Sequence, residues 1–487
     1  MTPVPPQYYG EAQQPPRAHS ALPALAYFFV VFLLLLLLNV GATSKGNYHL
    51  VHLIYSGVFF GCFLPLGIFL LFPKENLPFF QVICVLYGIH YSLFPFYVWW
   101  TPWWHFEYLT LDQMIKPALI SLGGIWIMVI GYYTRPIQLI LNALPPFEIQ
   151  WDENSAKRIS LIFMGIGFVG LFMLKIAGEA GQITVFMSKL ALIGILALIL
   201  LRIRGQLGLV GFVGTLIYTV LYLGISISAG NSGPIALFMV AVVLLYIGIK
   251  RRIPWLVVIL GIVILFPFMF AKYEYRDQVW DPRGEVKVEG GAEAAKNVAT
   301  FASIAFKVVT GSLDAERTSF ALQAISIRFD ISYLFGHVVF LTPKDVDYLY
   351  GETYQDVAWK LVPRVIWPDK PNPTYGLIFG HMYHILSIDD ESTSINFPQL
   401  VEMYVNFGPW GVFIGMFIMS QIYWLLTHMM NLPGSGDWLT VFAVSIFSDL
   451  FRIESNFSLV VAGIFYHVLL LYVIGFFIRV QPGKQRG

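Results

Sequence analysis

The stretch that decides the fold is residues 21–42, ALPALAYFFVVFLLLLLLNVGA, which contains no charged side chain. A helix needs about 20 apolar residues to cross the hydrocarbon core of a bilayer. The run is longer than the apolar part of a signal peptide and has no small-residue cleavage site, so we interpret it as an uncleaved first span. Residues 1–20 are rich in Pro, Gln and Tyr, and this composition predicts a disordered tail.

The composition of the whole chain points the same way. Hydrophobic residues make up 57% of the 487 residues and charged residues only 12%, whereas soluble domains carry roughly 25% charged residues. The sequence therefore predicts an integral membrane protein embedded in a lipid bilayer. A net charge of +1 argues against nucleic acid as a partner. The two cysteines, Cys62 and Cys84, lie in apolar runs, so we expect neither a disulfide framework nor a thiolate metal site.

Apolar runs of spanning length recur along the chain and predict an all-α protein with about twelve transmembrane helices. The expected spans are 21–42, 49–72, 77–98, 114–134, 158–178, 182–201, 207–229, 233–249, 253–271, 405–427, 437–455 and 457–479. They divide the chain into a tail (1–20), nine spans (21–271), one large hydrophilic insert (272–404), three spans (405–479) and a second tail (480–487).

The cations between these spans predict the orientation. With the N-terminus in the cytoplasm, nearly all cations of the short loops fall on the inner side, and Lys250-Arg251-Arg252 is the strongest group. The positive-inside rule then places both termini in the cytoplasm. The insert lies on the outer face, because long loops cross the membrane largely regardless of their charge.

The insert contains the segment 363–373, PRVIWPDKPNP, which has four prolines in eleven residues. Each proline fixes φ and removes a backbone donor, so this segment cannot be a spanning helix. It carries Arg364 and Lys370 beside Trp367 on a stiff backbone. A rigid cationic loop on a membrane protein suits the phosphate group of a lipid-linked substrate.

Two further parts of the insert have a recognisable pattern. Phe301, Ile304 and Ala305 recur at helical spacing, which predicts an amphipathic helix of the kind that lies in the membrane interface. The apolar stretch 319–341 carries Arg328 and Asp330. Charges in apolar helices mark functional sites or buried ion pairs, and the sequence leaves both interpretations open.

Candidate proton-transfer groups follow the proline-rich segment. Glu402 and Asn406 are four residues apart, so they share a helix face where the tenth span begins. Glu402 is either a general base or a helix-start carboxylate favoured by the macrodipole. His381 is the other candidate base. His381 and His384 have no third ligand at a recognisable spacing, so we expect no metal site.

The region from about residue 320 to 420 resembles the bacterial oligosaccharide repeat-unit polymerases (the O-antigen polymerase, or Wzy-type, family). The resemblance rests on the order and spacing of several short motifs. These are Pro363-Arg364, Trp367-Pro368-Asp369-Lys370-Pro371, Phe379-Gly380-His381, Thr393-Ser394-Ile395-Asn396 and the stretch from Glu402 to Gly408. Outside this region the chain matches the family only in being polytopic.

The resemblance implies a GT-C-like, inverting, metal-independent glycosyltransferase of the bacterial inner membrane, with no cofactor and its active site facing the periplasm. It would move a growing glycan from undecaprenyl pyrophosphate to a lipid-linked repeat unit, with a chain-length regulator protein as partner. Glu402 or His381 would act as the base. The cations assigned to the pyrophosphate are Arg328, Arg364, Lys370 and Arg452, and the residues assigned to the sugars are Trp367, Tyr383 and Asn406.

Two other functions remain open. An O-antigen ligase needs the same pyrophosphate clamp and base, and differs only in its acceptor. A flippase for lipid-linked oligosaccharides would be expected to carry its charges inside the bundle. No P-loop, dinucleotide fingerprint or HExxH pattern occurs, so the energy for a transfer reaction would come from the substrate.

Overall fold

The computed structural model describes residues 22–42, 49–72, 75, 77–92, 109–134, 153–176, 182–228, 233–250, 252–279, 291–312, 316–319, 329–362, 366–367, 369–371, 375–391, 393–395, 397–431 and 436–477. Within these ranges every regular element is a helix and no strand occurs. The predicted all-α class is therefore confirmed.

A helix occupies each of the twelve ranges in which the sequence predicts a span. These helices are α1 (Leu22–Ala42), α2 (His49–Leu71), α3 (Phe79–Ser92), α5 (Leu111–Thr134), α7 (Glu153–Ile176), α8 (Gln182–Ile203), α9 (Leu209–Ser228), α10 (Gly233–Lys250), α11 (Trp255–Val279), α17 (Gln399–Met430), α18 (Gly436–Leu450) and α19 (Phe457–Phe477). Between α11 and α17 lie α12 (Gly291–Val309), α14 (Ile331–Leu341), the 3-10 helix η1 (Glu352–Tyr354), α15 (Asp356–Lys360) and α16 (Tyr375–Met382).

Four helical segments of the described chain are long and apolar enough to cross a membrane: His49–Leu71, Asp112–Thr134, Trp255–Arg276 and Gln399–Met430. Large apolar side chains also remain uncovered, as at Val210 of α9 (88% exposed) and Leu256 of α11 (70% exposed). A soluble monomer rarely leaves such surface in contact with water. The protein is therefore a membrane protein with at least these four candidate spans.

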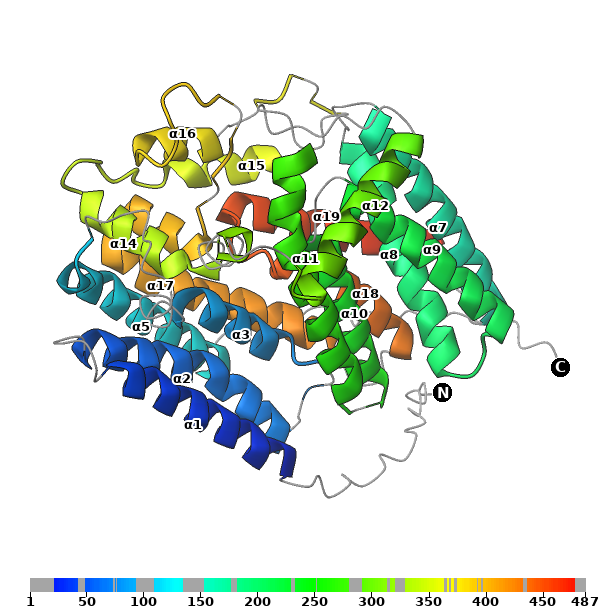
Figure 1. Ribbon diagram of the computed structural model, residues 1–487, viewed down its shortest axis with the longest axis horizontal. Coiled ribbons are helices and arrows are strands. Elements are labelled where there is room, and N and C mark those ends of the chain that lie inside the picture. The colour runs from blue at the N-terminus through cyan, green and yellow to red at the C-terminus, as the bar shows by residue number, and fades with distance from the viewer. Residues whose placement is uncertain are drawn as a thin grey trace, which may run out of the picture.

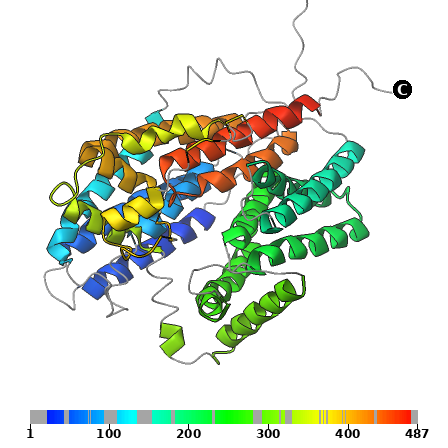
Figure 2. The ribbon, with the colours of Figure 1, turned by 90° about the horizontal axis from the view of Figure 1, so that it is seen from above.

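The helices form two groups that meet at α18. Figure 2 shows α7 to α12 gathered on one side, with α1 to α5 and α14 to α19 on the other. In the second group α17 packs against α5, α3 and α14, while α8 and α10 of the first group pack against α18. Figure 1 shows α14, α15 and α16 together beside α17. Helices distant in the sequence therefore share one interior.

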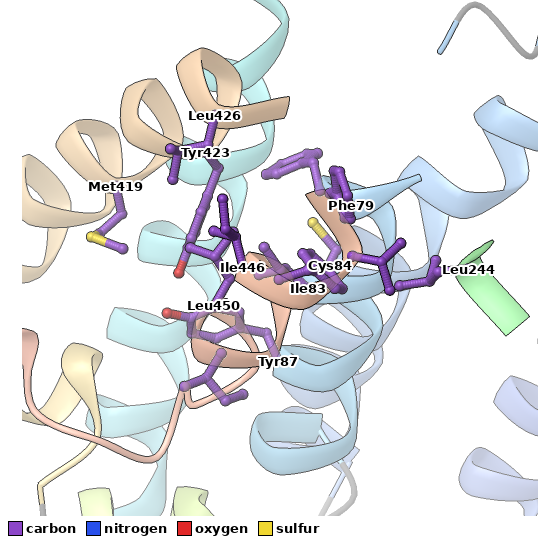
Figure 3. Close-up of a cluster of buried hydrophobic side chains, with 14 of the residues drawn as sticks. Phe79, Ile83, Cys84, Tyr87, Leu244, Met419, Tyr423, Leu426, Ile446 and Leu450 are labelled. Atoms are coloured by element: carbon purple, nitrogen blue, oxygen red, sulfur yellow. The ribbon is translucent and has the colours of Figure 1, made fainter. Parts of the chain in front are cut away.

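The core that joins these helices is built from large aromatic and aliphatic side chains. Figure 3 shows Phe79 and Tyr87 of α3 beside Tyr423 of α17 and Ile446 of α18. Leu244 of α10 reaches the same cluster from the other group of helices. All five side chains are buried, so this cluster fixes the position of α17.

Small residues let neighbouring helices approach closely. A Cβ atom added at Gly124 of α5 would lie 2.7 Å from Val412 Cγ1 of α17, and one added at Gly167 of α7 would lie 2.5 Å from the backbone nitrogen of Ala191 of α8. Close backbone approach at glycine is typical of helix packing in membranes. Larger residues at these two positions would push the helices apart.

The helix α17 is interrupted two turns from its start. Phe407 and Gly408 leave helical geometry (φ of Gly408 is 63°), and Pro409 has no N–H to donate to the carbonyl of Val405. The backbone N–H of Leu349 fills that gap by donating to the Val405 oxygen at 3.0 Å. The interruption therefore attaches the segment before η1 to α17.

Some features of the insert differ from the sequence interpretation. The predicted apolar face of α12 exists, but Phe301 and Ile304 pack against Tyr275 of α11, so this face contacts protein. The helix α11 continues to Val279, eight residues beyond the predicted end of the ninth span, and this extension forms the surface on which α12 packs. Asp330 lies outside α14 and caps it, with Oδ1 accepting the N–H of Tyr333 at 3.3 Å.

Candidate functional site

Lys370 ties the proline-rich segment to the residue that precedes it, Val362. Its ammonium group donates to the carbonyl oxygen of Val362 (2.9 Å), and its backbone N–H donates to the carbonyl oxygen of Trp367 (3.2 Å). Lys370 is 7% exposed and Trp367 is 38% exposed. Arg364 lies outside the described residues. Lys370 therefore directs at least one of its three donors into the protein and shapes the segment that carries Arg364.

His381 lies in the last turn of α16 and is oriented by one hydrogen bond. Its Nε2 lies 3.0 Å from the carbonyl oxygen of Asp390. Because a carbonyl only accepts, Nε2 carries the hydrogen and Nδ1 keeps the lone pair. Stacking of Phe379 on Phe397, with ring centroids 4.2 Å apart, holds α16 near the start of α17. The residue His381 is half-buried, so it is not sealed inside the core.

His384 does not continue the face of α16 on which His381 lies. The helix ends at Met382, and His384 has a left-handed backbone with φ of 55°. Within the described ranges, no three His, Cys, Asp or Glu side chains are grouped closely enough to hold a metal ion.

Tyr383, which the sequence interpretation assigns to the sugars, is fully buried. Its hydroxyl is 2.7 Å from Oγ1 of Thr342, and its carbonyl oxygen accepts from Nε2 of His337 at 2.7 Å. Both polar groups are thus engaged with the segment that begins at α14, and Tyr383 positions the chain after α16 against α14.

Asn406 of α17 is also buried, and it binds protein groups on both sides of its amide. Its Nδ2 donates to Oγ1 of Thr353 (2.9 Å) and to the carbonyl oxygen of Glu402 (2.8 Å). Its Oδ1 accepts the N–H of Gly351 at 2.8 Å. The predicted shared face of Glu402 and Asn406 is therefore confirmed, and Asn406 fastens η1 to α17.

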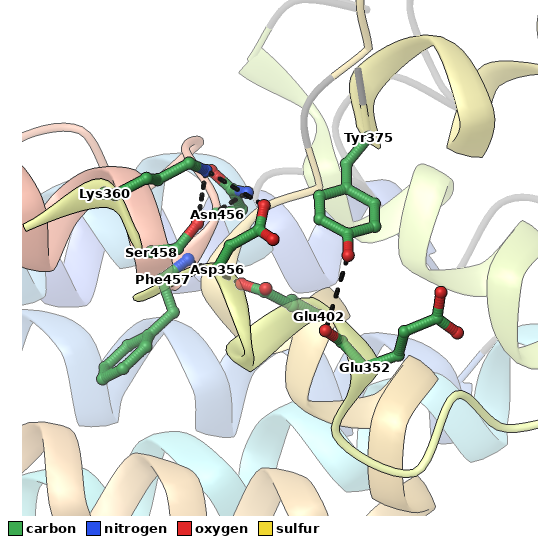
Figure 4. Close-up of polar contacts among 8 residues, drawn as sticks. All are labelled: Glu352, Asp356, Lys360, Tyr375, Glu402, Asn456, Phe457 and Ser458. Atoms are coloured by element: carbon green, nitrogen blue, oxygen red, sulfur yellow. Dashed lines mark hydrogen bonds and ion pairs between the residues drawn. The ribbon is translucent and has the colours of Figure 1, made fainter. Parts of the chain in front are cut away.

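Glu402 lies at the centre of a buried polar cluster that three elements supply. Its Oε2 accepts the backbone N–H of Phe457, the first residue of α19, at 2.6 Å. The side chain is 0% exposed. The Thr353 hydroxyl faces the same carboxyl group without reaching hydrogen-bonding geometry at Oε1. Figure 4 shows Asp356 and Lys360 of α15 beside Glu402.

Lys360 links α15 to the start of α19. Its Nζ donates to Oγ of Ser458 at 2.6 Å and lies 3.8 Å from Oδ2 of Asp356. Asn456 donates from Nδ2 to the same Ser458 oxygen at 3.2 Å. The hydroxyl of Tyr466 on α19 donates to the Lys360 carbonyl oxygen at 2.7 Å. We call Asp356, Lys360, Glu402, Asn456 and Ser458 the α15–α19 cluster.

Burial governs the electrostatics of the α15–α19 cluster. It raises the pKa of Asp356, and the ammonium group of Lys360 only partly opposes this shift. Burial also lowers the pKa of Lys360, against the attraction of the Asp356 and Glu402 carboxylates. Tyr375 of α16 lies near enough to sense the same charges, and burial together with Asp356 raises its pKa. The cluster holds two acidic groups and only one basic group, so it carries no excess of positive charge that would attract an anion.

The remaining predicted pyrophosphate ligands have other surroundings. Arg452 is exposed in the connection between α18 and α19, and its carbonyl oxygen accepts the N–H of Ser455 at 3.0 Å. Glu454 of that connection lies 3.4 Å from Nε2 of His90. Arg328 lies outside the described residues.

Sequence reasoning found Glu402 but missed its partners. Asp356 and Lys360 are four residues apart, a spacing that predicts one shared helix face, and this signal was available. Asn456 and Ser458 lie about a hundred residues further on in an ordinary connection, and no sequence pattern pairs them with Lys360.

The fold and these sites define a helical membrane protein with a polar insert attached to an interrupted helix. The chain belongs to the family described as a domain of unknown function (DUF8712), whose model matches residues 133–482. The match includes the proline-rich segment, His381 and the whole α15–α19 cluster. No curated protein and no solved structure matches the chain.

Proposed function

We propose that the protein is a membrane glycosyltransferase, a polysaccharide polymerase. It transfers a growing glycan from undecaprenyl pyrophosphate to a lipid-linked repeat unit, with inversion and without a catalytic metal. The observation that carries the proposal is the placement of His381. A half-buried imidazole with a fixed tautomer follows closely on the segment that carries Arg364 and is closed by Lys370. Displacing a diphosphate requires a base for the attacking hydroxyl and cationic groups for the departing diphosphate.

In this proposal Arg364 stabilises the departing pyrophosphate. The planar guanidinium donates two parallel hydrogen bonds to phosphate oxygens. Arg328 and Arg452 supplement this charge, and Lys370 contributes mainly by holding the loop closed. The α15–α19 cluster is buried and contains two acidic groups for one basic group, which supports assigning the anion to the proline-rich segment.

His381 rather than Glu402 serves as the base in this proposal. The acceptor hydroxyl must come within hydrogen-bonding distance of the base. The carboxyl group of Glu402 is fully buried and one of its oxygens is taken by Phe457, whereas His381 is half-buried and keeps the lone pair on Nδ1.

The membrane arrangement is part of the same proposal. About twelve helices span the bacterial inner membrane, both termini are cytoplasmic and the insert faces the periplasm, where a chain-length regulator would act. The distribution of cations between the helices supports this orientation.

The interrupted helix α17 favours one other function. Secondary transporters bind substrates at discontinuous helices near buried charges, and α17 breaks at Phe407-Gly408 within two turns of Glu402. A flippase for lipid-linked oligosaccharides is therefore the second candidate.

Deletion of the gene separates these functions. Loss of a polymerase gives lipid A capped with single repeat units, loss of a ligase gives none, and loss of a flippase leaves the precursor on the cytoplasmic side. With purified protein, we expect turnover of lipid-linked substrate in excess EDTA. Activity that disappears with the chelator and returns with magnesium would contradict the proposed arginine clamp.

A further inference from the structure

Three buried oxygens of the α15–α19 cluster accept no hydrogen bond from the described residues, although the ammonium group of Lys360 lies 3.8 Å from one of them, Oδ2 of Asp356. They are Oε1 of Glu402, Oδ2 of Asp356 and Oδ1 of Asn456. The residues that carry them are 0%, 2% and 4% exposed. Buried polar atoms nearly always have a partner, so each exception calls for a missing group. All three atoms are acceptors, so the missing group is a donor or a cation.

The charges in the cluster point to a cation. When Glu402 and Asp356 are both ionised, they carry two negative charges against the one positive charge of Lys360. Removing an uncompensated charge from water is costly. The two carboxylates lie close enough to repel each other, and Figure 4 shows the side chains of Asp356, Lys360 and Asn456 pointing together above Glu402. One additional positive charge would neutralise the cluster.

Size and coordination decide which cation fits. The three oxygens are too deeply buried for a sugar or a peptide amine to reach. A single shared proton bridges at most two of them, whereas a metal ion coordinates several oxygens at once. A divalent ion would leave a net positive charge in place of the negative one. Carbonyl and carboxylate oxygens are the ligands that hard cations prefer.

We propose that Glu402, Asp356 and Asn456 bind one monovalent cation, such as sodium, and that this ion joins α15, α17 and the start of α19. The site does not depend on the glycosyltransferase proposal, because the ion takes no part in the transfer.

Thermal unfolding of the purified protein in detergent tests the site. Cys62 and Cys84 are both fully buried, so a thiol-reactive dye reports unfolding. We expect the Tm to be a few degrees higher in sodium chloride than in choline chloride at the same ionic strength, since a ligand of the folded state stabilises it by mass action. Magnesium chloride should not replace sodium chloride at matched ionic strength.

Variants locate the ion. Glu402→Gln keeps the shape of the side chain but removes its charge, so we expect the sodium-dependent rise in Tm to disappear and the Tm in choline chloride to match or exceed that of the wild type. Asn456→Ala should shift the response to higher sodium concentrations. The control is Glu153→Gln, which removes an accessible carboxylate paired with Lys157 on α7 and should leave the sodium response unchanged.

The proposal is overturned if the wild-type Tm is the same in sodium, potassium and choline chloride, or if Glu402→Gln keeps the full sodium response. If Glu402→Gln does not fold, Asp356→Asn replaces it in the same comparison. Retention of radioactive sodium by the wild type on gel filtration provides the direct measurement, and absence of retention at sodium concentrations that raise the Tm also overturns the proposal.

Discussion

The backbone N–H of Phe457 donates to Oε2 of Glu402 at 2.6 Å, and this hydrogen bond ties the first residue of α19 to the first turns of α17. The bond joins α17 and α19, which are separated by α18 in the sequence. Because Lys360 binds Ser458, the residue directly after Phe457, the proline-rich segment that begins three residues after Lys360 has a fixed starting point on the membrane helices.

Replacing Asn406 should destabilise the fold. Asn406→Ala leaves the N–H of Gly351 and the hydroxyl of Thr353 without their partner, and a buried group left unsatisfied costs about 1–3 kcal/mol. We expect a lower Tm together with weaker attachment of η1 to α17. Asn154→Ala, at an exposed position near the start of α7, is the control. Equal Tm values for the two variants would show that the Asn406 hydrogen bonds contribute nothing.

The stability should depend on pH through Asp330. Burial raises the pKa of Asp330 from 3.8 to about 7, so between these pH values the folded state binds more protons than the unfolded state. The contribution of Asp330 to stability is therefore largest below pH 3.8 and falls as the pH rises toward 7. Asp330→Asn keeps the helix cap and removes the titration. We expect the Tm difference between variant and wild type to grow across this window. Parallel Tm curves would contradict the assignment.

The sequence predicted most of the helices but few of the contacts between them. Apolar length alone located twelve helices, because crossing a bilayer requires such runs. The hydrophobic pattern of the sequence could not show that the apolar face of α12 packs on Tyr275. A helix face that contacts protein and one that contacts lipid carry the same apolar residues. The start of α17 at Gln399, six residues before the predicted span, was hidden by the polar residue Glu402, whose hydrogen-bond donor comes from α19.

In the candidate site, too, the sequence predicted individual residues but not the contacts between them. His381 and Glu402 were predicted because imidazole and carboxylate are the usual bases. The structure then distinguishes the two side chains by their burial, and burial depends on residues far away in the sequence. The partners of Lys360 come from the start of α19, so a local pattern could not reveal them.

Topology is open to direct measurement. A reporter fused after Lys250 should be cytoplasmic, and one fused after Gly290 should be periplasmic, because in the proposed topology α11 carries the chain across the membrane between them. The same location for both fusions would mean that α11 does not span and that the insert is not external.

The identity of the base can be tested by two variants. His381→Gln removes the basic nitrogen, so we expect the transfer rate to fall by roughly 10²–10⁴ while binding of the donor lipid survives. Glu402→Gln should retain most of the activity, because its carboxyl group is sealed against Phe457. Rates of polymer formation at matched protein levels provide the measurement. The reverse result, with Glu402→Gln inactive and His381→Gln active, would make Glu402 the base.

The central claim is that Arg364 binds the pyrophosphate, and binding of undecaprenyl pyrophosphate to Arg364 variants tests it most directly. Arg364→Lys keeps the charge but loses the bidentate geometry. Losing one donor to a developing anion typically costs about 10²–10³ in rate. We expect severe loss of polymer formation in Arg364→Lys and at least as much in Arg364→Ala, with weaker binding of the diphosphate lipid in both. Arg204→Lys, at an arginine paired with Asp437 by a 2.9 Å hydrogen bond, should bind normally. If Arg364→Ala binds undecaprenyl pyrophosphate as tightly as the wild type, the proline-rich segment is only a scaffold and the proposed function loses its foundation.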